Sequence, residues 1–575
     1  VRVCHVGSAA YGSGQGWERT TLWSQFRFRW HGLAAAGVFA VALLSWALAS
    51  PTASAPDDDL HIANIYCLHD ASTCRSDDWA WPWGSPWWSP NPSDRRGPEY
   101  KGARKAYPDL WQYEYPRALP CYVTNGSTWY NPDAAVPANC LNDEDSTVDR
   151  PPSLDNLGYY PSLYYRVASM FTGDTVRESV VHWRVLNVIT AIAVLSVSLL
   201  LSAPRYRRPL AVAALTASMP LGLFLMSSTN PSAWLIIGTA AFLGPAVTLL
   251  RERGSPGVLT MRLAFVVLCL VMMLAGRSEG VGHAAVLVVV ALMLGLKAPR
   301  YVYATMLTLG LLVGSVALTV FLRSEDAKTS FYTDVIREGL GIGSGTSSLW
   351  DALLANPDFF FGPAASRLGW LEIALPGSAT VAIAAAFWGA AFLGIAVMFW
   401  RKVLAIALVG AVLLLVPATI TAGGAAFQPT RYFLPLVYML AFVFLVPDLG
   451  KWLPRWSNAQ WIALGAALSV ANSLSLLYLT VRYVSGIQPG TTNPLSLAAA
   501  GTPDWWWGAW LSPFGNWLLG SVAFAVGVGL LFTLPSIREG AEDHPDEDAP
   551  KQSDDPYHEF WNPPEDPQVQ VPAAR

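Results

Sequence analysis

Long apolar runs, separated by short polar turns, occupy most of this chain of 575 residues. The first runs from His31 to about Ser54. Its basic flank and trailing small residues also fit a signal peptide. We interpret it as an uncleaved helix, because the run is long and many further spans follow it. The later runs, each near the roughly 20 residues that cross a bilayer, lie at about 181–203, 209–227, 231–250, 257–276, 280–297, 301–322, 376–400, 403–422, 432–448, 459–481 and 514–534.

This pattern predicts an all-α polytopic membrane protein with about 12 transmembrane helices and a long first loop. No repeat of fixed period is visible. The predicted parts are a disordered cytoplasmic lead at 1–30, a first transmembrane helix at 31–55, an extracytoplasmic loop domain at 56–180, a transmembrane domain at 181–535 with outer loops 323–375 and 482–513, and an acidic disordered cytoplasmic tail at 536–575.

Basic residues give the predicted orientation. Alternate turns carry arginine or lysine, as the cytoplasmic side requires, whereas the turns near Asn230 and Gly423 carry almost no charge. Both termini are therefore expected inside and the first loop outside. The basic turns contain Arg205, Arg207, Arg208, Arg251, Arg253, Lys297, Arg300, Arg401, Lys402, Lys451 and Arg455.

Composition agrees with a chain that lies mostly in lipid. The chain is 53% hydrophobic and 14% charged, against about 25% charged in soluble domains, and its 26 tryptophans suit membrane interfaces. The net charge is −4, and 11 acids lie between Glu539 and the C-terminus. Because the remainder is only mildly basic, nucleic acid is not an expected partner.

Four cysteines lie within the first loop, at Cys67, Cys74, Cys121 and Cys140. Their confinement to one polar segment favours two disulfides on an oxidising, extracytoplasmic side. Of three connectivities we favour the short-range pairs Cys67–Cys74 and Cys121–Cys140, and four free thiols are the alternative. A zinc site is less favoured, because no CxxC spacing occurs.

An acidic cluster follows the first apolar run directly. Charge so close to hydrocarbon is costly and suggests a functional site. Asp57 and His61 are four residues apart and would share one face of a helix. A carboxylate here could take a proton from an acceptor hydroxyl, or Asp57 and Asp58 could bind a divalent cation, Mg, Mn or Ca. Simple capping of the helix that follows is the alternative.

Several short motifs occur in an order that resembles one family of actinobacterial polytopic membrane proteins, the domain of unknown function 2142 family. That family is similar to GT-C glycosyltransferases, and the resemblance covers most of residues 30–535. The motifs are PDDDLH and NIYC, Arg117–Tyr122, Asn230-Pro231-Ser232, Leu368-Gly369-Trp370, Gln428-Pro429-Thr430-Arg431-Tyr432, Leu434-Pro435, and Arg482-Tyr483 followed by Gly486.

The resemblance implies a bacterial plasma-membrane enzyme that moves a sugar from a polyprenyl-phosphate donor to an envelope glycan or lipid acceptor on the outer face. In GT-C enzymes an Asp just past the first helix acts as base or metal ligand, which implies catalytic roles for Asp57, Asp58 and His61. The family usually reads Asp-Glu-Pro-Ala-His, whereas Asp58-Asp59-Leu60 replace Glu-Pro-Ala here. The shorter acid leaves the metal role open.

The donor phosphate has its own candidate residues, Gln428, Arg431 and Tyr432 at the outer start of one span and Arg482 at the exit of another. Arginine can hold phosphate bidentately, and structural anchoring is the alternative reading. We expect Arg431 to be the counterpart of Asp57. Arg277 and Glu279, at another outer turn, are expected to pair with each other.

The sequence lacks the signals of several other functions. The sequence has no Walker A motif and no HExxH motif, and no acid lies clearly within a span, as a proton-coupled transporter would need. A transporter or flippase of envelope precursors and a non-catalytic envelope assembly protein remain the alternatives.

Overall fold

The structure is a computed structural model of the chain, and it describes residues 15–69, 161–252, 254–277, 279–295, 367–369, 373–422, 430–448, 454–485, 506–507 and 511–538. These residues belong to one compact unit, Val1–Gly540. Apart from one isolated bridge between Leu368 and Ile373, the regular structure of the described part is helical. The predicted tail, the outer loops and the segment 301–322 lie wholly or largely outside the described residues. Residues 15–30, in the lead that was predicted to be disordered, are instead part of a helix that begins at Gln15.

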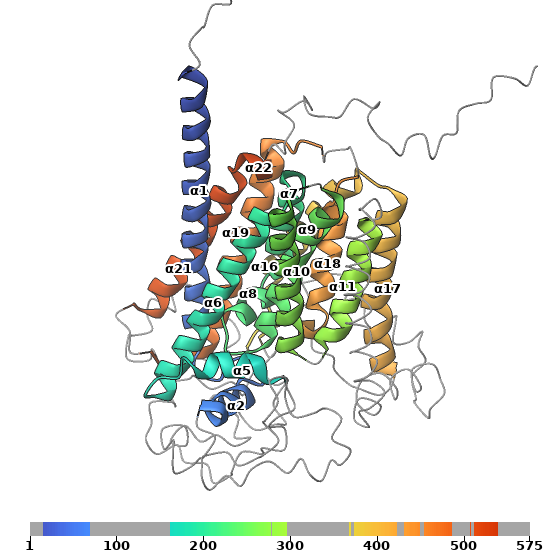
Figure 1. Ribbon diagram of the computed structural model, residues 1–575. Coiled ribbons are helices and arrows are strands. Elements are labelled where there is room, and N and C mark those ends of the chain that lie inside the picture. The colour runs from blue at the N-terminus through green and yellow to red at the C-terminus, as the bar shows by residue number, and fades with distance from the viewer. Residues whose placement is uncertain are drawn as a thin grey trace, which may run out of the picture. The chain divides into compact units, whose positions relative to one another are not determined.

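The helices are named in chain order (Figure 1). They are α1 (Gln15–Leu48), α2 (Asp58–His69), α5 (Ser162–Ser169), α6 (Val176–Leu201), α7 (Pro204–Ser218), α8 (Leu221–Met226), α9 (Ser232–Arg251), α10 (Pro256–Gly276), α11 (Gly280–Leu294), α16 (Gly377–Ile395), α17 (Trp400–Ala422), η6 (Thr430–Tyr432, a 3-10 turn), α18 (Leu434–Leu445), α19 (Asn458–Ser485), α21 (Pro513–Phe532) and α22 (Pro535–Arg538).

Seven of the described helices are long and apolar enough to cross a membrane. They lie within α1, α6, α9, α10, α16, α19 and α21, and α11 and α18 are shorter apolar helices. The outward faces of several carry exposed apolar side chains, among them Leu200 on α6 and Phe392 on α16. Exposed apolar surface of this kind suits lipid rather than water, so the described part is that of a helical membrane protein.

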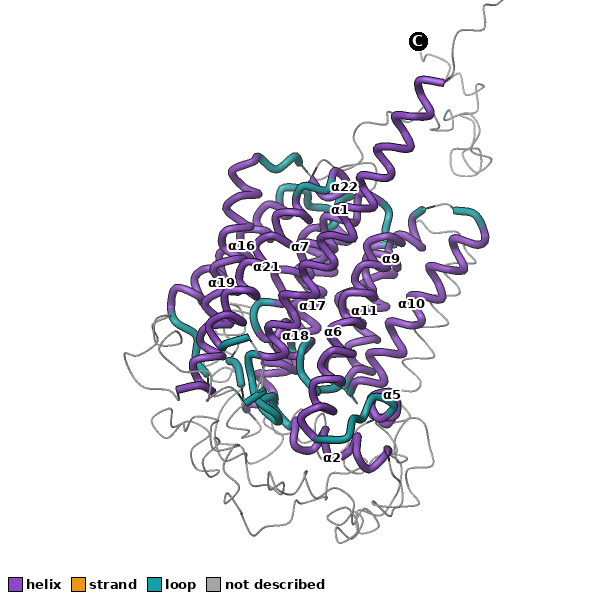
Figure 2. Tube along the Cα trace, turned by 90° about the vertical axis from the view of Figure 1, so that its left-hand side faces the viewer, coloured by secondary structure: helices purple, strands orange, loops and turns teal. Residues whose placement is uncertain are grey.

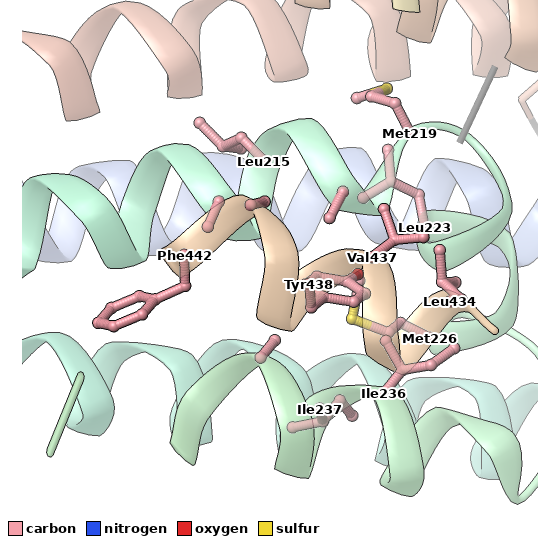
Figure 3. Close-up of a cluster of buried hydrophobic side chains, with 14 of the residues drawn as sticks. Leu215, Met219, Leu223, Met226, Ile236, Ile237, Leu434, Val437, Tyr438 and Phe442 are labelled. Carbon is pink, nitrogen blue, oxygen red and sulfur yellow. The ribbon is translucent and has the colours of Figure 1, made fainter. Parts of the chain in front are cut away.

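Helix α9 lies at the centre of the bundle. Every residue in its most apolar 18-residue segment is buried. In the other helices that are long enough to span a membrane, 33–44% of the corresponding segment is buried. A helix that is apolar on all sides needs protein neighbours on all sides, and α6, α7, α10, α11 and α18 supply them. In Figure 3, α18 lies between α7–α8 and α9, and Tyr438 of α18 lies beside Met226 of α8.

The apolar segment expected at 209–227 is not one straight spanning helix. It forms α7, which ends at Ser218, and the short α8, which begins at Leu221. Pro220 has no amide hydrogen and disfavours helical backbone in the residue before it, and Met219 is accordingly extended, with ψ 128°. The break leads into the buried polar run Ser227–Asn230, which lies just before α9.

The two ends of the bundle differ. Helices α2 and α5 lie at one end and α22 at the other (Figures 1 and 2). At the α22 end, Arg208 donates to the carbonyls of Ile537 and Arg538, each at 2.7 Å, and Arg205 pairs with Glu252. Cations at the carboxyl ends of helices are favourable. The end with α2 carries the acidic cluster.

Candidate functional site

The loop between α1 and α2 is held by a buried arginine from α6. Arg184 is 1% exposed. Its Nη1 donates to the carbonyls of Ala47 and Ser50 at 2.6 and 2.7 Å, and its Nη2 donates to the carbonyl of Pro51 at 2.6 Å. A buried guanidinium is tolerated when several acceptors surround it. Arg184 therefore fixes the end of α1 and the start of the loop.

Three further side chains hold the same loop from distant parts of the chain. Asn230 Nδ2 donates to the Pro56 carbonyl at 2.7 Å, the Tyr483 hydroxyl donates to the Ser54 carbonyl at 3.2 Å, and Trp507 Nε1 donates to the Leu48 carbonyl at 2.9 Å. A loop whose carbonyls are bonded in this way cannot move without breaking buried hydrogen bonds. The segment that presents Asp57 is thus preorganised.

Backbone strain is concentrated in this loop. Ala53 has φ 64° and Asp57 has φ 62°, and a left-handed conformation costs an L-residue roughly 1–2 kcal/mol. Aspartate tolerates it better than most residues. The Asp57 carbonyl accepts the amide of His61 at 3.0 Å, so Asp57 takes the capping position of α2 with its backbone. Its carboxylate has another partner.

That partner is Arg431 of η6. Arg431 Nη2 lies 2.7 Å from Asp57 Oδ2, and the two side chains are 5% and 24% exposed. The same nitrogen donates to the Tyr432 hydroxyl at 3.1 Å. The structure therefore brings Asp57, Arg431 and Tyr432 together, which is the proximity that the sequence led us to expect for Asp57 and Arg431.

Charges around Asp57 keep it ionised. Burial alone would raise its pKa, but the guanidinium groups of Arg431 and Arg277 outweigh that effect, and the pKa lies below its usual value. Burial lowers the pKa of His61 to about 3, against the opposing effect of Asp57. His61 is therefore neutral near pH 7, and the two arginines are the charges that stabilise the Asp57 carboxylate there.

His61 lies deeper than Asp57 in the same cluster. It is 0% exposed, and its Nδ1 lies 2.9 Å from the hydroxyl of Tyr165 on α5. Tyr164 and Tyr165 of α5 are both buried and hydrogen-bonded within the protein. His61 thus joins α2 to α5.

Asp58 is used differently from Asp57. It is 0% exposed, its Oδ2 accepts the Ala55 amide at 3.2 Å, and the same oxygen lies 3.9 Å from Arg184 Nη2. These contacts close the turn before α2. Sequence reasoning grouped Asp58 with the catalytic residues, and the geometry favours a role in holding the loop.

The cation hypothesis for Asp57 and Asp58 gains no support from this arrangement. Each carboxylate faces a different arginine. Within the ranges that the structure describes, no group of three or more histidine, cysteine or acidic side chains could hold a metal ion. The described residues therefore do not fit a divalent cation at this place.

Arg277 is a member of the cluster that sequence reasoning missed. It does pair with Glu279, as expected, with Nε and Nη2 at 3.2 and 3.1 Å from the two carboxylate oxygens. Its guanidinium carbon also lies 4.9 Å from the centre of the Tyr432 ring. The available signal was its position at an outer turn, but the nearby Glu279 pointed only to a local ion pair.

The other predicted site residues are less informative. Arg482 is 3% exposed and lies over the ring of Tyr483, 5.2 Å from its centre. Gln428 lies outside the described residues. Cys74, Cys121 and Cys140 also lie outside them, so the pairs Cys67–Cys74 and Cys121–Cys140 stay predictions.

The fold and the site define a polytopic helical membrane protein with a charged cluster at one end of the bundle. A family model described as "Predicted membrane protein (DUF2142)" matches residues 40–440, and the chain belongs to this family. Comparison with the curated proteins gives no match, and comparison with the solved structures gives none either.

Proposed function

We propose that the protein is a GT-C-like glycosyltransferase that moves a sugar from a polyprenyl-phosphate donor to an envelope glycan or lipid acceptor. The observation that carries the proposal is the contact between Asp57 and Arg431 at 2.7 Å. This contact places a carboxylate, which can accept a proton, next to a guanidinium, which can hold a phosphate. Both lie beside the end of a spanning helix.

In the proposed reaction, Asp57 takes the proton of the acceptor hydroxyl. The acceptor oxygen forms a bond to the anomeric carbon of the sugar, and the bond from that carbon to the phosphate oxygen breaks. The phosphate leaves with the electron pair and is held by Arg431. Positioning and charge stabilisation would supply most of the rate enhancement.

The same proposal covers the orientation and the number of spans. The end with Asp57 faces outward, both termini are cytoplasmic, and about 12 helices cross an actinobacterial plasma membrane. The basic residues at the α22 end support this orientation. A glycosylation or protease reporter placed after Asp174 should be accessible only from outside the cell. A reporter placed after Glu252 should be accessible only from the cytoplasm. The reverse pattern would place the end with Asp57 on the cytoplasmic side and refute the proposed orientation.

The transfer step is tested with purified full-length protein and radiolabelled polyprenyl-phosphate sugar. Asp57→Asn keeps the size of the side chain and removes the base, so we expect transfer to fall by about 10²-fold or more. Asp174→Asn, at the same end of the bundle and exposed, is the matched control and should transfer like wild type. Full transfer by Asp57→Asn would refute the catalytic assignment.

The two alternative functions give other outcomes in the same test. A flippase would move the labelled lipid across a vesicle membrane without any transfer of sugar. An assembly protein would tolerate both Asp57→Asn and Arg431→Gln in cells. No observation in the described residues favours either of these over transfer.

A further inference from the structure

Two buried guanidinium groups share one aromatic ring in the site. The guanidinium carbon of Arg277 lies 4.9 Å from the centre of the Tyr432 ring, and that of Arg431 lies 5.0 Å from it. The two carbons are therefore at most about 10 Å apart. The side chains come from different parts of the fold, since Arg277 follows α10 and Arg431 precedes α18.

The two arginines have unlike counter-ions. Glu279 meets Arg277 through two nitrogens, and it is only two residues away in the sequence. Asp57 meets Arg431 at one nitrogen, and its side chain is 24% exposed. Tyr432 is partly buried. The side chain of Glu279 is 22% exposed, so the cluster is accessible beside Asp57, Glu279 and Tyr432. The side chains of Arg431 and Arg277 lie deeper, at 5% and 4% exposed.

Charge balance shows why one arginine does not suffice. In the structure, Arg431 already neutralises Asp57. A phosphate that took Arg431 would add its own negative charge next to the Asp57 carboxylate, and like charges at this distance repel. The charge of Arg277 also acts on Asp57, so it is close enough to offset part of that repulsion.

We propose that Arg277 and Arg431 together, with Tyr432 between their contacts, form a two-guanidinium site for the phosphate group of the donor, and that the bound phosphate displaces Asp57 from Arg431. The inference rests on the proposed function for the identity of the donor. It adds a second binding residue and an order of events, because Asp57 is released to act as a base only once the phosphate is in place.

Removing a competing carboxylate distinguishes this proposal from a purely structural ion pair. If Arg277 binds phosphate, Glu279→Gln frees its guanidinium, and phosphate should bind more tightly. Asp57→Asn should likewise bind phosphate more tightly while it loses transfer. A structural pair predicts unchanged affinity in both variants, with loss of stability alone.

The test uses full-length protein in phosphatidylcholine nanodiscs, titrated with a long-chain polyprenyl monophosphate that carries no sugar. Loss of a charge-assisted hydrogen bond should weaken binding about ten- to a hundredfold in Arg431→Gln. Arg277→Gln could unfold the protein by leaving Glu279 unpaired, so the double variant Arg277→Gln/Glu279→Gln is measured as well, and it should weaken binding to a similar degree. Arg166→Gln on α5 is the control.

Two further titrations identify the source of the phosphate. Inorganic phosphate should compete with the lipid at high concentration if the phosphate group itself is recognised. Replacing part of the phosphatidylcholine with phosphatidylglycerol should leave the affinity unchanged. Competition by phosphatidylglycerol equal to that by polyprenyl phosphate would overturn the proposal, because it would indicate general attraction of anionic lipid.

The results separate this inference from the proposed function. Wild-type affinity in the Arg277→Gln/Glu279→Gln protein, or unchanged affinity in Glu279→Gln, overturns the role of Arg277 whether or not sugar is transferred. Tight phosphate binding that depends on both arginines, without any transfer by wild type, supports this site and refutes the transferase. Absence of phosphate binding to wild type overturns the site.

Discussion

Asp57 and Arg431 are 374 residues apart in the sequence, and their side chains meet at 2.7 Å. The contact joins the strained loop after α1 to the 3-10 turn that precedes α18. The charges of the two side chains neutralise each other. Asp57 can therefore act as a base, and Arg431 can bind a phosphate, only after their contact has been broken. The chemistry proposed for this site follows from that exchange.

Substitution of Arg184 should destabilise the protein more than substitution of any surface arginine. Arg184→Gln removes three carbonyl contacts and leaves Asp58 buried without the nearby charge. Breaking a buried ion pair costs about 3–5 kcal/mol. Thermal unfolding in detergent should show a clear fall in Tm, or the protein should fail to accumulate. Arg367→Gln, which changes an exposed side chain, should change Tm little, and equal Tm values for the two variants would contradict the role of Arg184.

Asn230→Ala should impair transfer without abolishing phosphate binding. Asn230 holds the Pro56 carbonyl next to Asp57, and its Oδ1 accepts the Ser232 amide at 2.9 Å. Loss of these buried hydrogen bonds should cost about 1–3 kcal/mol of stability. Displacement of Asp57 should lower kcat about tenfold or more, measured together with polyprenyl-phosphate affinity. Asn458→Ala on α19 is the control, and a kcat equal to wild type for Asn230→Ala would show that the loop does not need this anchor.

His61 should make the protein less stable in mild acid. Its pKa is about 3 in the folded protein and roughly 6.5 when unfolded. Between these values the unfolded state binds a proton that the folded state does not, so stability falls as the pH drops below about 6.5, by up to about 1.4 kcal/mol per pH unit. The facing groups Asp57, Arg277 and Arg431 keep their charges from pH 7 to pH 5.

The measurement is the unfolding free energy of wild type and of His61→Gln at pH 7.5 and at pH 5. Wild type should lose about 2 kcal/mol more than the variant over this interval, because only wild type has the histidine to protonate on unfolding. The value at pH 7.5 serves as the internal reference for each protein. Parallel pH dependence in the two proteins would show that His61 is not buried in its neutral form.

Two glycines of α16 should respond differently to alanine. A Cβ at Gly394 would collide with the backbone carbonyl of Phe444 on α18, whereas one at Gly389 would meet nothing within 4 Å. Overpacking against backbone costs about 1–3 kcal/mol, so Gly394→Ala should lower Tm and Gly389→Ala should leave it unchanged or slightly higher. Equal effects would mean that α16 and α18 are not in such close contact.

Sequence reasoning reached the helical membrane class and the proximity of Asp57 to Arg431, but not the contacts that hold them. Apolar runs of roughly 20 residues predict spanning helices without any further information. The break at Pro220 also has a sequence signal, which hydropathy alone did not register. Arg184 gave no such signal, since its acceptors are backbone carbonyls more than 130 residues away. Contacts of that kind depend on tertiary packing.

Arg277 illustrates a different limit. Its pairing with Glu279 was predictable from two adjacent charges, and that local explanation concealed its second neighbour, Tyr432. A charged residue with a satisfying partner nearby in the sequence can still belong to a cluster assembled from other helices. Local spacing identifies partners that are close in the chain, such as Arg277 and Glu279, but not those that tertiary packing brings together.

The loop after α1 is made early in synthesis, but the side chains that hold it are made late. Arg184 and Asn230 belong to the first half of the chain, whereas Tyr483 and Trp507 lie near its end. The carbonyls of Leu48 and Ser54 therefore obtain their partners only after α19 and the segment beyond it have been inserted. A protein truncated before α19 would therefore lack two of the four side chains that hold the carbonyls of this loop.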